Sequence, residues 1–174
     1  MKKKAKGSLG SRLAKIKALA LDCDGILSDT IIYYMGSGQW SRSYSIRDGY
    51  GIKKMLDAGY KVTVITNSRS EDISERMKTL KIPKWFDGVT DKNHAWEQFL
   101  SENNLSASEV AYMGDDEPDL PLLARAGVAF TVSDAMADVK KAADYVAKRP
   151  AGNGAVREVI ELILQASKKP AKGK

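Results

Sequence analysis

Residues 17–25 read Lys-Ala-Leu-Ala-Leu-Asp-Cys-Asp-Gly. A short apolar run that ends in a carboxylate is typical of a buried β-strand with a polar residue at its carboxyl end. Gly25 permits a sharp turn immediately afterwards. Two carboxylates spaced two residues apart, Asp22 and Asp24, can then converge on one point. On these residues alone, an ordinary polar turn after a strand is an equally good interpretation.

Further apolar segments follow along the chain. Apolar β-prone runs alternate with amphipathic helical segments, which predicts βαβ units and a mostly parallel sheet covered on both faces. The expected strands lie at 17–22, 61–66, 86–89, 110–115, 128–132 and 145–147. The expected helices lie at 48–58, 70–80, 91–103, 118–126, 135–143 and 155–165, and a hairpin is expected from 31–35 and 40–45.

Three of the predicted strands end in polar residues. Asp22 ends the first, Thr66 ends the second, and the acids of the sequence Gly114-Asp115-Asp116-Glu117-Pro118-Asp119 follow a later one. Ligands of open parallel sheets bind beyond the carboxyl ends of the strands. We therefore expect these groups to meet at one edge, although an acidic helix start also accounts for part of the second cluster.

Converging carboxylates repel one another unless a proton or a cation lies between them. Magnesium prefers carboxylate and phosphate oxygens. With a cation present, Asp22 can attack phosphorus, and Asp24 can protonate the leaving oxygen and later deprotonate water. Thr66 and Asn67 offer polar groups for a phosphoryl oxygen, although simple turn chemistry explains them as well. Lys92 stands in the first turn of a predicted helix, where its charge is unfavourable, which suggests a role in neutralising phosphate. On this residue alone, an exposed surface lysine is the more common interpretation.

The basic charge of the chain lies at its ends. The net charge is +6, but residues 1–17 hold seven Lys or Arg and residues 167–174 hold four Lys, so the rest carries 17 basic against 22 acidic residues. We predict disordered basic tails at 1–15 and 168–174 around one domain at 16–167. No nucleic-acid partner and no membrane segment are expected. The single cysteine, Cys23, excludes an internal disulfide and fits a cytoplasmic protein.

The ordered set Asp-x-Asp-Gly, Thr, Lys and Gly-Asp-Asp-x-x-Asp resembles the haloacid dehalogenase superfamily of phosphohydrolases over about residues 17–166. The resemblance implies a single three-layer Rossmann-like α/β domain that forms an aspartyl-phosphate. It makes Asp22 the nucleophile and Asp24 the acid/base. It places Mg²⁺ on Asp22, the Asp24 main-chain carbonyl and Asp115, and the phosphoryl group on Thr66, Asn67 and Lys92. Asp116 and Asp119 are expected to be supporting acids.

Residues 45–52, the segment after Gly25 and residues 154–158 are similar to those of 3-deoxy-D-manno-octulosonate 8-phosphate phosphatases. This resemblance implies hydrolysis of a phosphorylated sugar acid. Its implied substrate contacts are Ser45, Ile46, Arg47, Asp48, Gly49, Lys53 and Arg76. Asn67-Ser68 stands where this family usually has Gly-Arg and where phosphatases of nine-carbon sialic-type sugar acids tend to have Gly-Glu. A 9-phosphate of such a sugar is therefore an alternative substrate.

The spacing between motifs leaves no room for a lid. Only 43 residues separate Asp22 from Thr66, and 25 separate Thr66 from Lys92, so we expect no cap domain. The predicted hairpin carries more apolar surface than an exposed hairpin needs: Ile31, Ile32, Tyr33, Tyr34, Trp40 and Tyr44. We expect it to pack against neighbouring subunits that close one another's sites, as the resemblance implies for a homotetramer.

Two non-phosphatase interpretations use similar residues. A phosphoryl-receiver module also combines acids, a Thr, a Lys and magnesium, but it carries its acid pair before the nucleophile strand and has no need of an acid at the position of Asp24. A regulatory protein that only kept the fold would not need the intact set of catalytic positions. Both remain less favoured alternatives.

Overall fold

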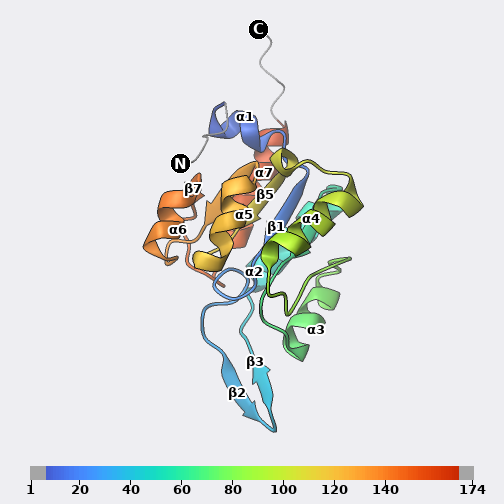
Figure 1. Ribbon diagram of the computed structural model, residues 1–174, viewed down its shortest axis with the longest axis vertical. Coiled ribbons are helices and arrows are strands. Elements are labelled where there is room, and N and C mark those ends of the chain that lie inside the picture. The colour runs from blue at the N-terminus through green and yellow to red at the C-terminus, as the bar shows by residue number, and fades with distance from the viewer. Residues whose placement is uncertain (1–6, 169–174) are drawn as a thin grey trace.

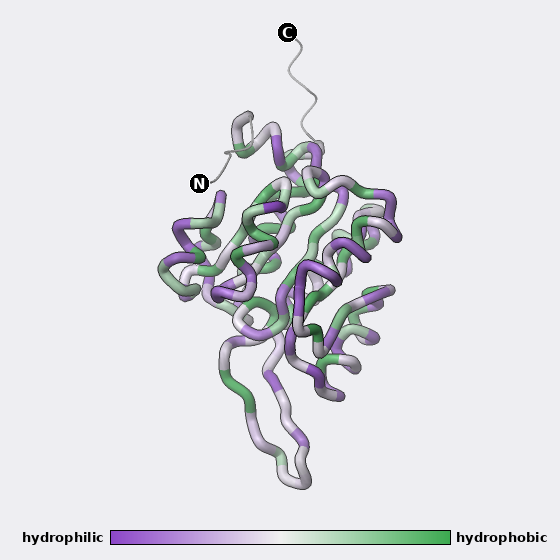
Figure 2. The backbone as a smooth tube through the Cα atoms, viewed as in Figure 1, coloured by the Kyte–Doolittle hydropathy of each residue, from purple (hydrophilic) through white to green (hydrophobic). Residues whose placement is uncertain are grey.

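Five parallel strands form the centre of the computed structural model, which describes residues 7–168 (Figure 1). Their order in the sheet is β4-β1-β5-β6-β7. The strands are β1 (Ala18–Leu21), β4 (Lys61–Val64), β5 (Val110–Met113), β6 (Val128–Thr131) and β7 (Tyr145–Val146). All residues of β1, β5 and β6 are buried, as expected for strands covered on both faces. The hydrophobic segments accordingly lie in the middle of the molecule (Figure 2).

Helices cover both faces of the sheet. Those behind it in Figure 1 are α2 (Ile46–Asp57) and α7 (Ala155–Lys168), and those in front are α4 (Lys92–Asn103), α5 (Leu120–Arg125) and α6 (Ala137–Ala142). Right-handed crossovers explain why α2 lies on one face and α4, α5 and α6 on the other, because the chain moves one way from β1 to β4 and then the other way to β5, β6 and β7. Helix α7 follows the last strand and packs against α2. The short helices α1 (Leu9–Leu13) and α3 (Glu71–Thr79) and the 3₁₀ segments η1 (Ala107–Glu109) and η2 (Glu117–Asp119) complete the fold.

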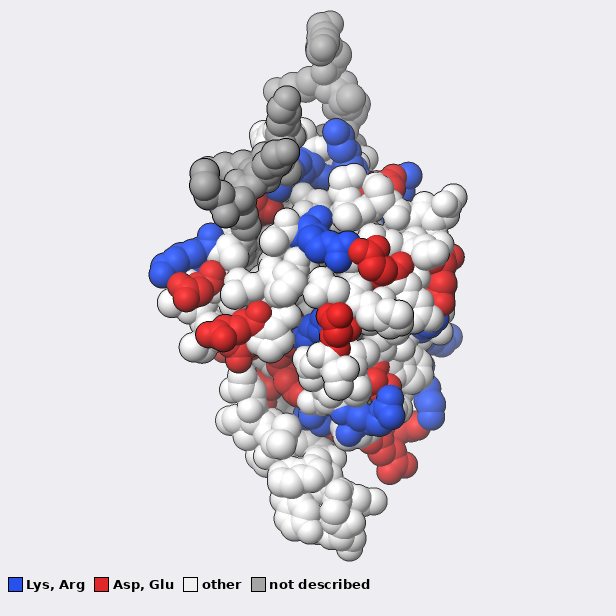
Figure 3. All heavy atoms as spheres, viewed as in Figure 1, with Lys and Arg blue, Asp and Glu red and all other residues white. Residues whose placement is uncertain are grey.

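A separate hairpin leaves the sheet after β1. Its strands, β2 (Tyr33–Gly36) and β3 (Gln39–Ser41), pair antiparallel and project away from the body of the protein (Figure 1). Residues 31–41 contain no charged side chain, and the projecting lower surface in Figure 3 shows none. Among the described residues there is no cap domain, so the predicted three-layer α/β fold with a hairpin and without a lid is confirmed.

The register of the strands places the predicted site residues at one edge. Leu21 of β1 pairs with Val64 of β4 on one side and with Met113 of β5 on the other. The residues that follow these three positions therefore begin side by side. The expected convergence at the carboxyl end of the sheet follows from this register.

Three sequence-based expectations need correction. Residues Leu9–Leu13 of the predicted N-terminal tail form α1, because Leu13 is buried against the core. The predicted strand at 86–89 is reduced to a single bridge between Ile65 and Phe86. Tyr44 packs against the core instead of joining the exposed face of the hairpin. Residues 1–6 and 169–174 of the predicted tails lie outside the described residues. In the part of the chain that is described, no helix has the length and apolar character needed to cross a bilayer.

Asp48 joins the two helices behind the sheet. Its side chain is buried, and its carboxylate accepts hydrogen bonds from the backbone N–H groups of Gly154 (2.9 Å) and Arg157 (2.7 Å) at the start of α7. These N–H groups have no partner within the helix, so Asp48 of α2 supplies an N-terminal cap from another element. This contact gives Asp48 a structural role besides its predicted contact with substrate.

We expect Asp48→Ala to lower the free energy of unfolding by about 2 to 3 kcal/mol, because charge-assisted bonds to a buried helix end are lost. Asp57→Ala is the matched control on the same helix. Asp57 is exposed and forms an exposed ion pair with Lys53, so its loss is expected to cost less than about 1 kcal/mol. Urea unfolding of both variants tests this, and equal losses would argue against the capping role.

Candidate active site

The turn after β1 carries two acids and depends on a glycine. The backbone N–H of Asp22 still donates to Met113 of β5 (2.9 Å), so Asp22 continues the line of the sheet. The carbonyl of Cys23 then accepts from Leu27 (2.8 Å), which closes a tight turn. Gly25 has φ +78°, and a Cβ there would lie 2.0 Å from Oδ2 of Asp115. Only glycine therefore allows this loop to approach the loop after β5 so closely.

Asp119 organises the floor of the site. Its Oδ1 accepts from Lys92 Nζ (2.7 Å) and from the Tyr112 hydroxyl (2.6 Å). Its Oδ2 accepts from the backbone N–H groups of Asp115 (2.9 Å) and Asp116 (3.3 Å). The carboxylate is buried and uses all of its acceptor sites, so it acts as a fixed hub between α4 and the loop after β5.

Lys92 carries its charge into this buried region from the first turn of α4. Its side chain is 5% exposed, and Nζ lies 3.0 Å from Oδ1 of Asp22 as well as 2.7 Å from Asp119. A buried ammonium is tolerated only when it is paired, and here two carboxylates pair it. This pairing explains why a lysine occupies a helix start, where the helix dipole disfavours it.

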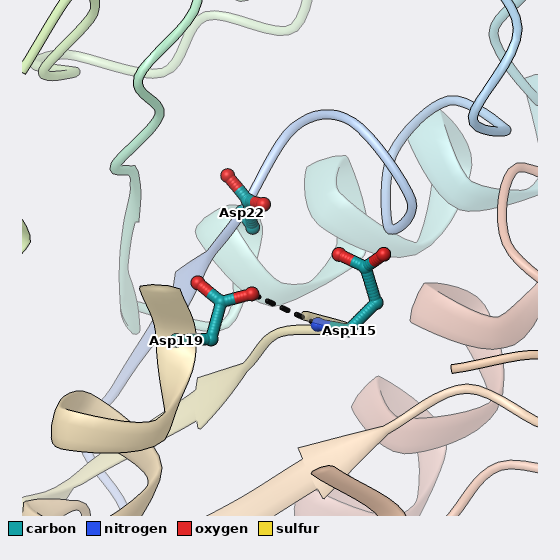
Figure 4. Close-up of side chains that lie close together, drawn as sticks. All are labelled: Asp22, Asp115 and Asp119. Carbon is teal, nitrogen blue, oxygen red and sulfur yellow. Dashed lines mark hydrogen bonds between the residues drawn. The ribbon is translucent and has the colours of Figure 1, made fainter. Parts of the chain in front are cut away.

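Asp22, Asp115 and Asp119 form an acidic cluster with one oxygen each within 4.8 Å of the others (Figure 4). Among the described residues, no hydrogen-bond donor reaches the buried Oδ1 atoms of Asp22 and Asp115, although Asp22 keeps its ion contact with Lys92. The oxygens of Asp119, in contrast, are all engaged. Carboxylate oxygens that are buried and without a donor suit a hard divalent cation. The cluster can therefore hold such a cation through Asp22 and Asp115.

The electrostatics of the cluster favour the same interpretation. Burial, and then the charge of Asp119, raise the pKa of Asp22 to about 8 in spite of the opposing effect of Lys92. Burial, and then Asp119 and Asp116, raise the pKa of Asp115 to about 7. Without a cation these carboxyls therefore resist ionisation. A divalent ion between them would favour the charged forms that the site needs.

Asp24 faces the same pocket and is held by a ring of donors. Arg42 binds both of its oxygens, through Nε to Oδ1 (2.5 Å) and through Nη2 to Oδ2 (3.1 Å). The hydroxyls of Ser68 (2.6 Å) and Ser28 (3.2 Å) add one hydrogen bond to each oxygen. Burial alone would raise the pKa of Asp24, but the bonds from Arg42 and Ser68 outweigh it and lower that pKa.

The end of β4 supplies the next group of residues. Thr66 is buried, and its hydroxyl accepts a hydrogen bond from the N–H of Ser68 (3.2 Å). The side-chain amide of Asn67 donates to the carbonyl of Val89 (2.6 Å), so it also braces the loop before α4. Neither Asn67 nor Ser68 adds a positive charge to the site.

These residues surround one open pocket of about 320 Å³. The pocket brings together most of the predicted site residues from the ends of β1, β4 and β5. Lys92 and Asp119 do not line it, but Lys92 contacts Asp22 and Asp119 contacts the backbone of Asp115. Its lining consists of Asp22, Asp24, Thr30, Ile32, Arg42, Thr66, Asn67, Ser68, Asp115 and Asp116.

The predicted substrate-binding residues lie elsewhere on the same chain. None of them lines the pocket around Asp22. A second pocket of about 480 Å³ between α2 and α3 includes Ile46, Gly49, Lys53 and Arg76. Arg47 lines a further pocket near the start of α7, and Ser45 caps α2 while its carbonyl accepts from Arg76.

Sequence reasoning missed Arg42 and Tyr112. Tyr112 lies within an apolar strand, where nothing distinguishes it from a core residue. Arg42 is the first charged residue after the uncharged stretch 30–41, which is the one signal that could have identified it. Its contact with Asp24 depends on how the hairpin folds back, and no local pattern encodes that.

Comparisons with known proteins agree on one group of enzymes. The haloacid dehalogenase-like hydrolase family matches residues 86–160. The 3-deoxy-D-manno-octulosonate 8-phosphate phosphatase of Haemophilus influenzae is 37% identical over 158 residues, which cover 91% of this chain and 88% of that protein. The crystal structure of the Yersinia pestis phosphatase of the same name has a TM-score of 0.90 at 37% identity, covering 92% of this chain and 87% of that one. The Moraxella catarrhalis phosphatase, crystallised with a magnesium ion, a phosphate ion and KDO, has a TM-score of 0.87 at 35% identity and covers 90% of both chains.

The raised carboxyl pKa values predict how stability depends on pH and metal. Between pH 3.8 and about pH 8, Asp22 keeps a proton in the folded metal-free protein and loses it in the unfolded chain. The free energy of unfolding of the metal-free protein therefore falls as the pH rises through this range. A cation binds the ionised carboxylates, so MgCl₂ is expected to raise the melting temperature more at about pH 8 than at about pH 5.5. Thermal unfolding followed by circular dichroism measures this.

Asp115→Asn is the control, because it removes one charged ligand and should abolish most of the MgCl₂ effect. An equal gain in melting temperature at both pH values, or an unchanged gain in Asp115→Asn, would contradict the assignment of the cation to this cluster.

Proposed function

This chain is a phosphatase that belongs to the haloacid dehalogenase-like hydrolases, and we propose that its substrate is 3-deoxy-D-manno-octulosonate 8-phosphate. One observation carries the proposal. The ends of β1, β4 and β5 bring Asp22, Thr66 and Asp115 to one pocket, with Lys92 paired to Asp22 beneath it. The curated relatives that share this fold are phosphatases of this sugar acid.

In the proposed mechanism Asp22 is the nucleophile. One of its carboxylate oxygens forms a bond to phosphorus while the bond between phosphorus and the sugar oxygen breaks. Asp24 is assigned to give a proton to the leaving sugar oxygen. Because the bonds from Arg42 and Ser68 lower its pKa, this role requires the negative charge of the bound phosphoryl group to raise that pKa again. Water then attacks phosphorus and passes a proton to Asp24, and the bond from phosphorus to Asp22 breaks. Inorganic phosphate and the sugar acid are the products.

The remaining residues handle charge. We assign binding of the phosphoryl oxygens to Thr66, Asn67 and Lys92. Asp119 positions Lys92, and Asp116, at the rim, supports the loop. Asp22, Asp115 and the main-chain carbonyl of Asp24 would hold Mg²⁺, which when bound offsets the negative charges of the carboxylates and the phosphoryl group. Support for Mg²⁺ comes from the donor set and from the magnesium-containing relative.

The sugar part of the substrate needs further contacts. Its carboxylate suits a guanidinium such as Arg47 or Arg76. Because Ser45, Ile46, Gly49 and Lys53 also lie outside the pocket of their own chain, contact with the sugar is most simply made across a subunit interface. We therefore propose that a neighbouring subunit completes each site.

The hairpin supports an assembly of this kind. It exposes six large apolar side chains, each about half exposed or more: Ile31, Ile32, Tyr33, Tyr34, Met35 and Trp40. Such a surface on a soluble domain usually marks an interface. Ile32 also lines the pocket, so a partner packed on the hairpin would reach its mouth. We propose a homotetramer built through this hairpin.

A substrate panel tests the activity. With MgCl₂ present, we expect the highest kcat/KM for the eight-carbon sugar acid 8-phosphate, compared with a nine-carbon sialic-type 9-phosphate and common sugar phosphates. Asp22→Asn should lose at least about 1,000-fold in kcat, because the nucleophile is gone. Asp24→Asn should lose about 100- to 10,000-fold while still binding Mg²⁺. Activity retained in Asp22→Asn would refute the mechanism. A higher kcat/KM for the 9-phosphate would refute the proposed substrate in favour of the nine-carbon sugar acid.

Gel filtration with light scattering tests the assembly. We expect a tetramer for the wild type and a smaller species for Met35→Lys, because a charge in an apolar interface is costly. Met136→Lys, at a similarly exposed hydrophobic position outside the hairpin, should leave the tetramer intact. A wild-type monomer at micromolar concentration would rule the assembly out.

A further inference from the structure

Arg42 reaches the pocket from the base of the hairpin, directly after β3. Its side chain is 5% exposed although it carries a permanent charge. Besides its two bonds to Asp24, its Nη1 donates to the Ser70 hydroxyl (2.9 Å) and to Asp72 Oδ1 (3.1 Å). One guanidinium therefore joins three separate elements: the turn after β1, the hairpin and the start of α3.

The geometry at Asp24 is that of a two-point clamp. Nε and Nη2 lie on the same edge of the planar guanidinium and meet the two oxygens of the carboxylate, which fixes its plane as well as its position. Asp72 pairs with the opposite side and holds the guanidinium in place. A lysine could not reproduce this arrangement, because its ammonium is a point charge.

Position matters for a group that exchanges protons with the substrate. A general acid must lie within hydrogen-bond reach of the leaving oxygen. A displacement of about 1 Å can cost about 100-fold in rate. Asp24 stands on a loop with no regular secondary structure, so its orientation has to come from side-chain contacts. Arg42 provides two of the four that it receives.

Arg42 is also the only cation in the lining of this pocket among the described residues. Arg69 differs from Arg42 in exposure, in pairing and in its position relative to the pocket. Its side chain is 73% exposed, it pairs loosely with Asp87 at 3.8 Å, and it does not line the pocket. The chain thus offers a matched arginine outside the site.

We propose that Arg42 is a positioning residue for the phosphatase reaction: from the hairpin, it holds the carboxylate of Asp24 in the orientation that serves the leaving oxygen and the attacking water. This inference rests on the acid/base role proposed for Asp24. It also means that the hairpin contributes to catalysis within its own chain, in addition to any contact with a neighbour.

The test compares two substrates in Arg42→Met, Asp24→Asn and the double variant. A sugar phosphate needs a proton on its leaving oxygen, whereas p-nitrophenyl phosphate has a leaving group that departs without one. We expect Arg42→Met to lower kcat/KM about 100-fold for the sugar phosphate and less than about threefold for p-nitrophenyl phosphate. In the Asp24→Asn background, Arg42→Met should cause no further loss for the sugar phosphate, because both changes remove the same function.

Two further variants separate positioning from folding. Arg42→Lys keeps the charge and should retain the melting temperature, yet lose at least about tenfold in kcat/KM for the sugar phosphate. Arg69→Met should match the wild type on both substrates. Equal losses on both substrates, multiplying effects of Arg42→Met and Asp24→Asn, or full activity of Arg42→Lys would overturn the proposal. Activity retained in Asp22→Asn would instead refute the proposed mechanism itself.

Discussion

The carboxylate of Asp119 is the contact on which the site depends. It binds Lys92, the Tyr112 hydroxyl and two backbone N–H groups of the loop after β5 at the same time. A buried network in which every member is satisfied is rigid, whereas a half-satisfied one is costly. This requirement sets the distance between α4 and the end of β5. The position of Lys92 beside Asp22 follows from it.

When the acids around Asp119 are ionised, their negative charges exceed the positive charge of Lys92, and either a proton or a bound cation relieves this excess. Asp22 and Asp115 lie close together and largely buried, and one Lys92 does not neutralise them together with Asp119. The fold bears this cost locally because the surrounding strands are buried and mostly apolar. A site that is poorly satisfied by itself and relieved by a cation and a phosphoryl group is what phosphoryl transfer requires. The charges of Asp22, Asp115 and Asp119 therefore lower the stability of the ligand-free fold while serving the reaction.

The order of strands and helices could be predicted, because each element carries its own hydrophobic period. The pattern of segment 86–89 predicts a strand, but Phe86 meets the sheet edge through one bridge and the chain then leaves it. The basic composition of the N-terminal segment predicts a tail that includes residues 9–13, but Leu13 is buried in the core, where α1 packs against α7 and β6. Tyr44 looked like a hairpin surface residue, but the chain turns inward before it. In each case a distant contact outweighed the local pattern.

The sequence by itself determined the chemistry of this protein. Asp22, Asp24, Thr66, Lys92 and Asp115 stand at strand ends or at a helix start, and parallel strands must deliver such residues to one edge. Only the tertiary structure decided which groups orient them. Arg42 binds Asp24 across 18 residues, and the Tyr112 hydroxyl binds Asp119, which in turn binds Lys92. The motif predicted Asp119 as a supporting acid, but no spacing rule links Arg42 to Asp24 or Asp119 to Lys92. Backbone periodicity is a local property and can be read along the chain, whereas the pairing of buried polar side chains depends on the complete packing of the fold.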